Sequence, residues 1–159
     1  MKYSTTLDQI QILSDILPLE SADKVMLHEE PYETSDTMFD GIHEVLCVPF
    51  TKYDKGPKTK YRNITYFPCW STGKLLDLLP SVISVRSNIT NEIYDYRIDI
   101  RKEKIDDKHF LYQIAYGSYG ENGGSWHDMV NSKQSSSLTE VCVSIIEALH
   151  RNKLFNFKD

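Results

Sequence analysis

The sequence predicts an α+β fold, in which an antiparallel sheet with a central Tyr-rich hairpin has helices packed on one face. Three observations support this prediction. Capped apolar helices are expected near both ends of the chain, strand patterns with a period of two occupy its middle, and the elements run in the order helix, strands, helix, hairpin, helix. With 159 residues, 40% hydrophobic and 26% charged, the chain is expected to form a single α+β domain over residues 1–159.

The first helix is expected over residues 7–17. Its apolar residues recur at near-helical spacing, and Thr6 with Gln9 forms a capping box that satisfies backbone N–H groups at the helix start. Pro18 ends this helix, because proline has no backbone N–H to donate and restricts the residue before it.

The segment that follows has no clear periodicity. Residues 19–42 combine acidic and turn-forming residues, and we expect only a short helix over residues 21–27. A short apolar run over residues 45–50 predicts a strand, which we place at a sheet edge because Pro49 cannot donate to a ladder. After a polar turn that contains Gly-Pro, residues 64–70 are expected to return as a strand.

The central part of the chain predicts one helix and the most regular strands. A leucine-rich helix starts at Ser71 and stops at Pro80, and residues 82–86 are expected to add a strand. Residues 94–101 alternate apolar with charged side chains, and residues 109–119 place Phe, Tyr and Ile on one face. A short polar turn joins the last two runs, so we expect an antiparallel hairpin.

The last part of the chain predicts a long loop and then a regular helix. Residues 117–136 contain four glycines and a serine-rich segment, and are expected to form a loop. Ser137 and Glu140 then form a capping box. The buried stripe of the helix is expected to consist of Leu138, Val141, Cys142, Ile145, Ile146 and Leu149.

Composition and charge exclude several classes of protein. A net charge of -5 and a pI of about 5.5 argue against binding of duplex nucleic acid, which normally needs a basic excess. No apolar run reaches the ~18 residues that span a bilayer, so we expect no membrane partner. Three cysteines without a CxxC pair, and a start without a signal-peptide pattern, indicate a reducing cytosol. No His or Cys motif has metal-site spacing, so we expect neither a metal nor a cofactor.

The stretch Ser71-Thr72-Gly73-Lys74 raises the question of a phosphate site. A P-loop needs GxxxxGK[ST] after a buried strand, but here Leu75 stands where the metal-binding hydroxyl belongs. An N-cap explains Ser71 or Thr72, whereas the free amides of a helix start, with Lys74 close by, would also suit an anion. Ser71, Thr72 and Lys74 are therefore ligand-binding candidates, with capping as the simpler explanation.

A second group of candidates lies in the basic stretch before residue 64. Lys58, Lys60 and Arg62 flank Tyr61, so positive charge for a phosphate lies beside a flat ring for stacking on a base. The same pattern is typical of a solvated hairpin tip that protects a sheet edge. Both interpretations stay open.

The third group lies in the glycine-rich segment. Tyr119 and Trp126 offer rings for stacking, and His127 offers a hydrogen-bonding group. His127 with Asp128 could also orient a general base, but no nucleophile can be identified to accompany them. The alternative is a plain surface loop in which Trp126 tucks back into the core.

A Trp-led leucine helix, "WSTGKLLDLLP", is followed by a Tyr-rich hairpin and the terminal "SLTEVCVSIIEALHRNKL". In these features residues 64–154 resemble small uncharacterised proteins of phages and prophages from gut bacteria. The resemblance implies a host bacterial cytosol and an accessory or counter-defence role, in which the protein binds a host protein or traps a nucleotide signal. It implies no active-site residues.

The sequence favours a binding protein over an enzyme, because it has no catalytic signature. We expect a homo-oligomer that sequesters a small phosphorylated, nucleotide-like ligand, with the basic stretch on the phosphate and Tyr61, Tyr119 or Trp126 on the base. Two alternatives stay open. One is a module that inhibits a host protein through an exposed strand edge, and the other is a small nucleotide-cleaving enzyme that uses His127 and Asp128.

Overall fold

The structure, a computed structural model, describes residues 4–31, 42–46, 62–120 and 123–159, and confirms the α+β class. In chain order its elements are α1 (Leu7–Ile16), a 3₁₀ turn η1 (Leu19–Ser21), β1 (Lys24–Pro31), β2 (Ile42–Leu46), β3 (Arg62–Cys69), α2 (Thr72–Leu78), β4 (Val82–Arg86), β5 (Ile93–Lys104), β6 (Phe110–Tyr119), β7 (Trp126–Asn131) and α3 (Leu138–Arg151).

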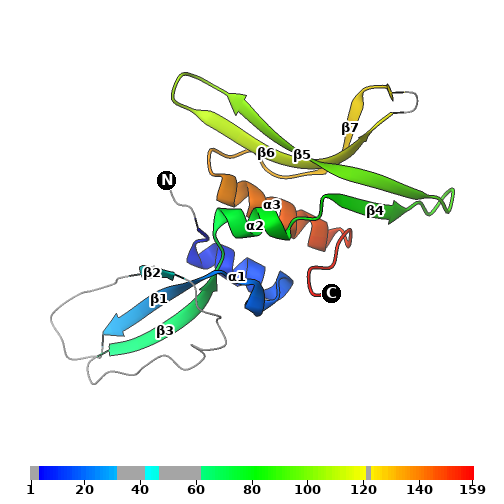
Figure 1. Ribbon diagram of the computed structural model, residues 1–159. Helices are drawn as coiled ribbons and strands as arrows, with labels where there is room; N and C mark the ends of the chain where they lie inside the picture. The colour runs from blue at the N-terminus through cyan, green and yellow to red at the C-terminus, as the bar shows by residue number, and fades with distance from the viewer. Residues whose placement is uncertain (1–3, 32–41, 47–61, 121–122) are drawn as a thin grey trace.

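The strands form two antiparallel sheets where one was expected. One sheet has the order β2-β1-β3 and the other has the order β4-β5-β6-β7. Helix α3 packs on β6 and β7, α1 and α2 pack on α3, and α1 also contacts β3 (Figure 1). In the described part of the chain, no helix covers the opposite face of the four-stranded sheet. We call this uncovered face the outer face.

Helix α1 forms as its sequence predicts. Thr6 Oγ1 accepts the backbone N–H of Gln9, and Gln9 Oε1 accepts the backbone N–H of Thr6, so both halves of the capping box are present. The helix ends at Ile16, two residues before Pro18. Its buried side chains are Ile10, Leu13 and Ile16, which join one core with residues of both sheets and of α2 and α3.

The helix expected over residues 21–27 is wrong. Helical geometry is limited to the three residues of η1, and β1 then pairs with β3 from Lys24 opposite Cys69 to Pro31 opposite Arg62. This partner strand lies far along the chain, so long-range pairing overrides the local composition.

The edge strand of the three-stranded sheet begins earlier than expected. It is β2, over Ile42–Leu46, whereas residues 47–61 lie outside the described residues. The strand expected over residues 64–70 is confirmed as β3, but β3 pairs with β1 rather than with β2.

In the four-stranded sheet, β4, β5 and β6 confirm the strands expected over residues 82–119. The loop expected over residues 117–136 is wrong, because it contains strand β7, which pairs with β6. A β-bulge at Tyr116/Gly117 shifts the register, so Gly117 faces Asp128 whereas Tyr116 faces Val130. The extra residue breaks the period of two that would have indicated a strand.

Helix α3 begins with an extended version of the predicted capping box. Ser137 Oγ accepts the backbone N–H of Glu140, as expected. The Glu140 carboxylate, however, accepts the Ser135 hydroxyl at 2.6 Å, and Ser135 Oγ in turn accepts the Ser137 backbone N–H. The predicted stripe is confirmed, with its residues from Val141 to Leu149 fully buried and Leu138 partly buried.

Tyr116 links the core of the four-stranded sheet to the end of α2. Its ring is fully buried, and its hydroxyl donates a hydrogen bond of 2.6 Å to the carbonyl oxygen of Pro80. Replacing Tyr116 by phenylalanine leaves that carbonyl without its partner. We expect Tyr116→Phe to lower the free energy of unfolding by about 1–2 kcal/mol in urea titrations. Tyr94→Phe is the control, because Tyr94 is exposed, and a similar loss there would contradict this role for Tyr116.

Candidate functional site

The start of α2 is held by protein groups. Ser71 Oγ accepts the backbone N–H of Lys74 at 3.1 Å, which is the hydrogen bond of an N-cap. The Asp23 carboxylate accepts the Ser71 backbone N–H at 2.7 Å and the Ser71 hydroxyl at 2.5 Å. Because a carboxylate already binds at this helix start, the surroundings of Ser71 repel a phosphate.

A cavity of about 510 Å³ lies beside the starts of the helices. Most of its lining side chains carry hydroxyl groups, among them Ser4, Thr6, Thr72, Ser137 and Thr139. Thr72 Oγ1 lies 2.5 Å from Thr139 Oγ1, which ties the start of α2 to that of α3. Among the described lining residues the one charged side chain is Glu140, so the cavity has no cation for a phosphate.

An open groove of about 420 Å³ lies on the outer face of the four-stranded sheet. Its lining residues are Arg97, Ile98, Asp99, Arg101, Tyr119 and Trp126. Side chains two residues apart on a strand point to the same face, which places Arg97, Asp99 and Arg101 together on β5. Tyr119 on β6 is paired with Trp126 on β7, and both side chains line the groove.

Gly117 allows β7 to lie this close over β6. It is paired with Arg97 on one side and with Asp128 on the other. A Cβ atom at Gly117 would lie 2.4 Å from the carbonyl oxygen of His127 and 2.7 Å from the ring of Trp126. Only glycine fits between these neighbours, because a backbone oxygen cannot move aside without disturbing the strand.

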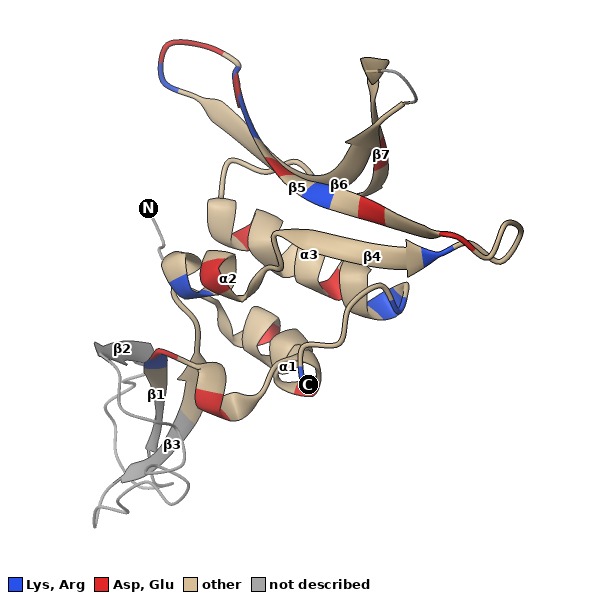
Figure 2. Ribbon diagram, turned by 45° about the vertical axis from the view of Figure 1, so that its right-hand side comes forward, with Lys and Arg blue, Asp and Glu red and all other residues tan. Residues whose placement is uncertain are grey.

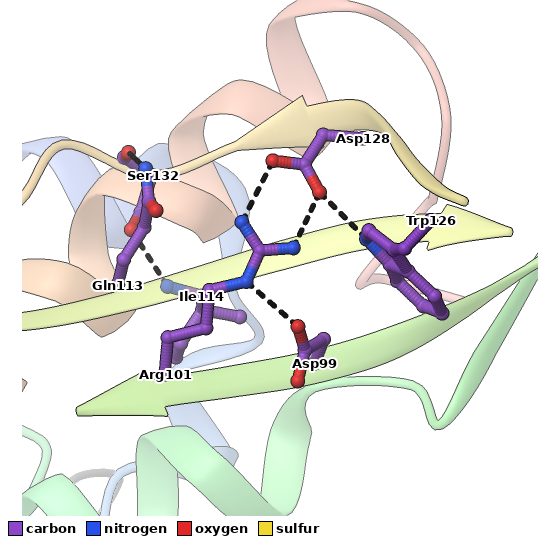
Figure 3. A network of polar contacts seen from close by, with 7 residues as sticks. All are labelled: Asp99, Arg101, Gln113, Ile114, Trp126, Asp128 and Ser132. Carbon is purple, nitrogen blue, oxygen red and sulfur yellow. Dashed lines mark hydrogen bonds and ion pairs between the residues drawn. The ribbon is translucent and has the colours of Figure 1, made fainter. Parts of the chain in front are cut away.

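Arg101 is clamped between two carboxylates (Figure 3). Its Nη2 and Nη1 donate to the two Asp128 carboxylate oxygens at 2.6 Å and 2.8 Å, and its Nε donates to Asp99 Oδ2 at 2.7 Å. The indole Nε1 of Trp126 donates to Asp128 Oδ1 at 2.7 Å. Bidentate pairing of this kind fixes the planes of both groups and orients the indole.

We call Arg101 together with Asp99 and Asp128 the clamp. Its hydrogen bonds shift the pKa values of Arg101 and Asp128. Hydrogen bonds from Arg101, and then from Trp126, lower the pKa of Asp128 to about 2, and the two carboxylates raise the pKa of Arg101 further above its ordinary value. Asp128 is therefore ionised, and Arg101 charged, at every pH near neutrality.

The lowered pKa predicts a dependence of stability on pH. An unfolded aspartate titrates near ~3.9, so the clamp contributes fully above about pH 5 and its contribution is lost as pH falls through ~4 to ~2. We expect Asp128→Asn to remove about 1 kcal/mol of this acid-sensitive stability, a value kept small because the pair is partly exposed. Urea titrations between pH 2.5 and 6 measure it.

Asp107→Asn is the matched control for this prediction. Asp107 pairs with Lys104 at 2.7 Å, but its side chain is 96% exposed. We expect the acid dependence of this variant to match that of the wild type. An acid dependence unchanged by Asp128→Asn would contradict a stabilising clamp.

Arg97 differs from Arg101 in its pairing. Within the described part of the chain, its exposed side chain makes no ion pair or hydrogen bond. Beside it, Tyr119 is 69% exposed, and its ring meets Trp126 edge to face with 5.2 Å between centroids. Figure 2 shows how positive and negative residues alternate along β5, so no broad basic surface surrounds Arg97. The groove thus offers one available cation next to two rings.

The structure brings together only part of the predicted site. Tyr119 and Trp126 lie in contact in the groove, and His127 precedes Asp128 on the same strand. Neighbouring residues on a strand point to opposite faces, and the Asp128 carboxylate binds Arg101 and Trp126, so the structure offers no His127–Asp128 general base.

The other two predicted groups do not join the groove. Ser71, Thr72 and Lys74 lie at the start of α2, which is on the covered side of the four-stranded sheet. Arg62 opens β3 in the other sheet. Lys58, Lys60 and Tyr61 lie outside the described residues.

Sequence reasoning missed Arg97, Asp99 and Arg101 as site residues. The signal was present, since their alternation along the strand indicated one polar face. The partner carboxylate Asp128 lies 27 residues from Arg101, and only the pairing of β7 with β6 brings it there.

Within the described ranges, no group of three or more His, Cys, Asp and Glu side chains is arranged to hold a metal ion. No helix in the same ranges is long and apolar enough to cross a membrane.

Comparison of the chain with models of known protein families, with curated proteins and with solved structures finds no match.

Proposed function

We propose that this protein binds and sequesters a small phosphorylated, nucleotide-like ligand in the outer-face groove, without catalysis. The observation that carries the proposal is Arg97, an exposed cation without a partner among the described residues, in the same groove as the rings of Tyr119 and Trp126. An arginine pairs with phosphate oxygens, and an exposed aromatic ring stacks on a base. A hollow of about 420 Å³ lies within the range of small-molecule sites.

The groove supports this ligand better than the larger cavity does. The cavity beside the helix starts has hydroxyl groups but only a carboxylate, Glu140, as its charged lining residue in the described chain. A phosphate there would lack a counter-charge, whereas in the groove it lies next to Arg97.

Binding without turnover is proposed because the described residues of the groove include no activated nucleophile or base. Its acidic groups, Asp99 and Asp128, already accept hydrogen bonds from Arg101. In the phage setting that the resemblance implies, such a protein would lower the free concentration of a nucleotide signal, and a homo-oligomer would present several grooves.

Native mass spectrometry tests the proposal. The protein, freshly purified from a bacterial host and then mixed with a pool of common nucleotides, is expected to carry one phosphorus-containing ligand per chain, recovered unchanged after denaturation. The same spectrum counts the subunits. A spectrum of bare protein in the presence of every nucleotide, or release of a cleaved product, would contradict the proposal.

A further inference from the structure

The outer-face groove contains a balanced set of charges. Its lining residues Arg97 and Arg101 supply two positive charges and its lining residue Asp99 one negative charge, and Asp128, which binds Arg101, supplies a second negative charge. Both carboxylates bind Arg101, so the clamp alone carries a net charge of about -1, and Arg97 brings the groove to neutrality. The charge available to a ligand is therefore a single positive one.

Arg101 is a poor second phosphate anchor, because two carboxylates already match its positive charge. Three of its five N–H groups, one on each guanidinium nitrogen, donate to Asp99 and Asp128 over 2.6 to 2.8 Å. The side chain of Asp99 is 41% exposed, so its negative charge faces the space above the groove. A second negative charge on the ligand would meet Asp99 rather than another cation.

From this balance we infer that the groove selects ligands with one negative charge, such as a cyclic nucleotide or another phosphodiester, over monophosphates and polyphosphates. The inference rests on the proposed ligand site. A phosphodiester carries one charge at neutral pH, whereas a phosphate monoester carries about -1.5 to -2. Each additional charge placed near Asp99 is expected to weaken binding about fivefold in water, since two like charges ~4 Å apart repel by about that factor.

Calorimetric titration with adenosine, 3′,5′-cyclic AMP, AMP and ATP at fixed salt compares ligands that share one base and differ in the charge of the phosphate group. We expect cyclic AMP to bind tightest, adenosine about tenfold more weakly because it lacks the partner of Arg97, and AMP about fivefold more weakly than cyclic AMP. ATP is expected to bind more weakly than AMP.

Asp99→Asn tests the residue responsible. The amide keeps the size of the side chain and an oxygen for Arg101 Nε, but removes the negative charge. In this variant we expect AMP to bind about as tightly as cyclic AMP, because the roughly fivefold difference expected for the wild type is lost. Asp107→Asn is the matched control, because Asp107 is exposed, pairs with Lys104 and does not line the groove. Lys104 lies ~23 Å along β5 from Arg97, far beyond the ~8 Å screening length.

The outcomes distinguish this inference from the proposed function. If all four compounds fail to bind, the ligand site itself is wrong, and the inference is lost with it. If affinity rises with each added charge, or if Asp99→Asn and Asp107→Asn act alike, the proposed site stands and the single-charge selection is overturned.

Discussion

Gly117→Ala is expected to lower the free energy of unfolding by about 2–3 kcal/mol and to detach β7 from β6. The added methyl group would lie 2.4 Å from the carbonyl oxygen of His127 and 2.7 Å from the ring of Trp126. Neither neighbour can move away without a loss of stability, because one is a backbone carbonyl and the other donates its indole N–H to Asp128. Urea titration followed by circular dichroism measures the loss, and hydrogen exchange of residues 126–131 reports on the detachment.

Gly73→Ala is the matched control for this substitution. Gly73 lies on the exposed side of α2, and a Cβ atom there would come no closer than 4.0 Å to another residue. Alanine favours helix more than glycine does, so this variant is expected to gain about 0.5–1 kcal/mol. A stable Gly117→Ala protein with protected β7 amides would contradict the close approach described for the groove.

The double variant Arg97→Gln with Tyr119→Ala is expected to lose at least about a hundredfold in affinity for cyclic AMP. A charged hydrogen bond contributes about 1.5–3 kcal/mol, and stacking of one base contributes about 1–3 kcal/mol. Both side chains are exposed, so the free energy of unfolding should change by less than about 0.5 kcal/mol for each substitution. Calorimetry measures the affinity, and urea titration verifies the fold.

Arg86→Gln with Tyr94→Ala controls for charge and aromatic content. These residues lie on the same sheet, but Arg86 donates to Asn91 and Tyr94 donates to Glu92, and neither lines the groove. The control variant should bind cyclic AMP as the wild type does. Equal losses in the two double variants would show that the groove has no special role.

Local rules were enough to predict the helices. The capping boxes and apolar spacing at Thr6 and Ser137 act within a few residues, so α1 and α3 follow from sequence. Ser71 or Thr72 was likewise predicted as an N-cap, and Ser71 is the one, although its contact with Asp23, 48 residues earlier, needed the structure. The helix expected over residues 21–27 failed because β1 depends on pairing with a strand outside that segment.

Two of the six lining residues of the candidate groove were predicted from sequence as site residues. Tyr119 and Trp126 were recognised by their residue types, and the polar face of β5 by its alternation. Strand β7 was missed because glycine, serine and a bulge hide the period of two, and the role of Gly117 depends on contacts across the sheet. Once β7 is assigned to a loop, the clamp between Arg101 and Asp128 cannot be foreseen.

The two tryptophans allow a direct test of where the ligand binds. Trp70 is fully buried and its indole N–H donates to Ser21, whereas the indole N–H of Trp126 donates to Asp128 in the groove. Nuclear magnetic resonance of the two indole signals during a titration with cyclic AMP separates these environments. The proposed site predicts that the Trp126 signal shifts in proportion to occupancy while the Trp70 signal stays in place. An unmoved Trp126 signal in the presence of saturating cyclic AMP, or a shift of the Trp70 signal alone, would contradict it.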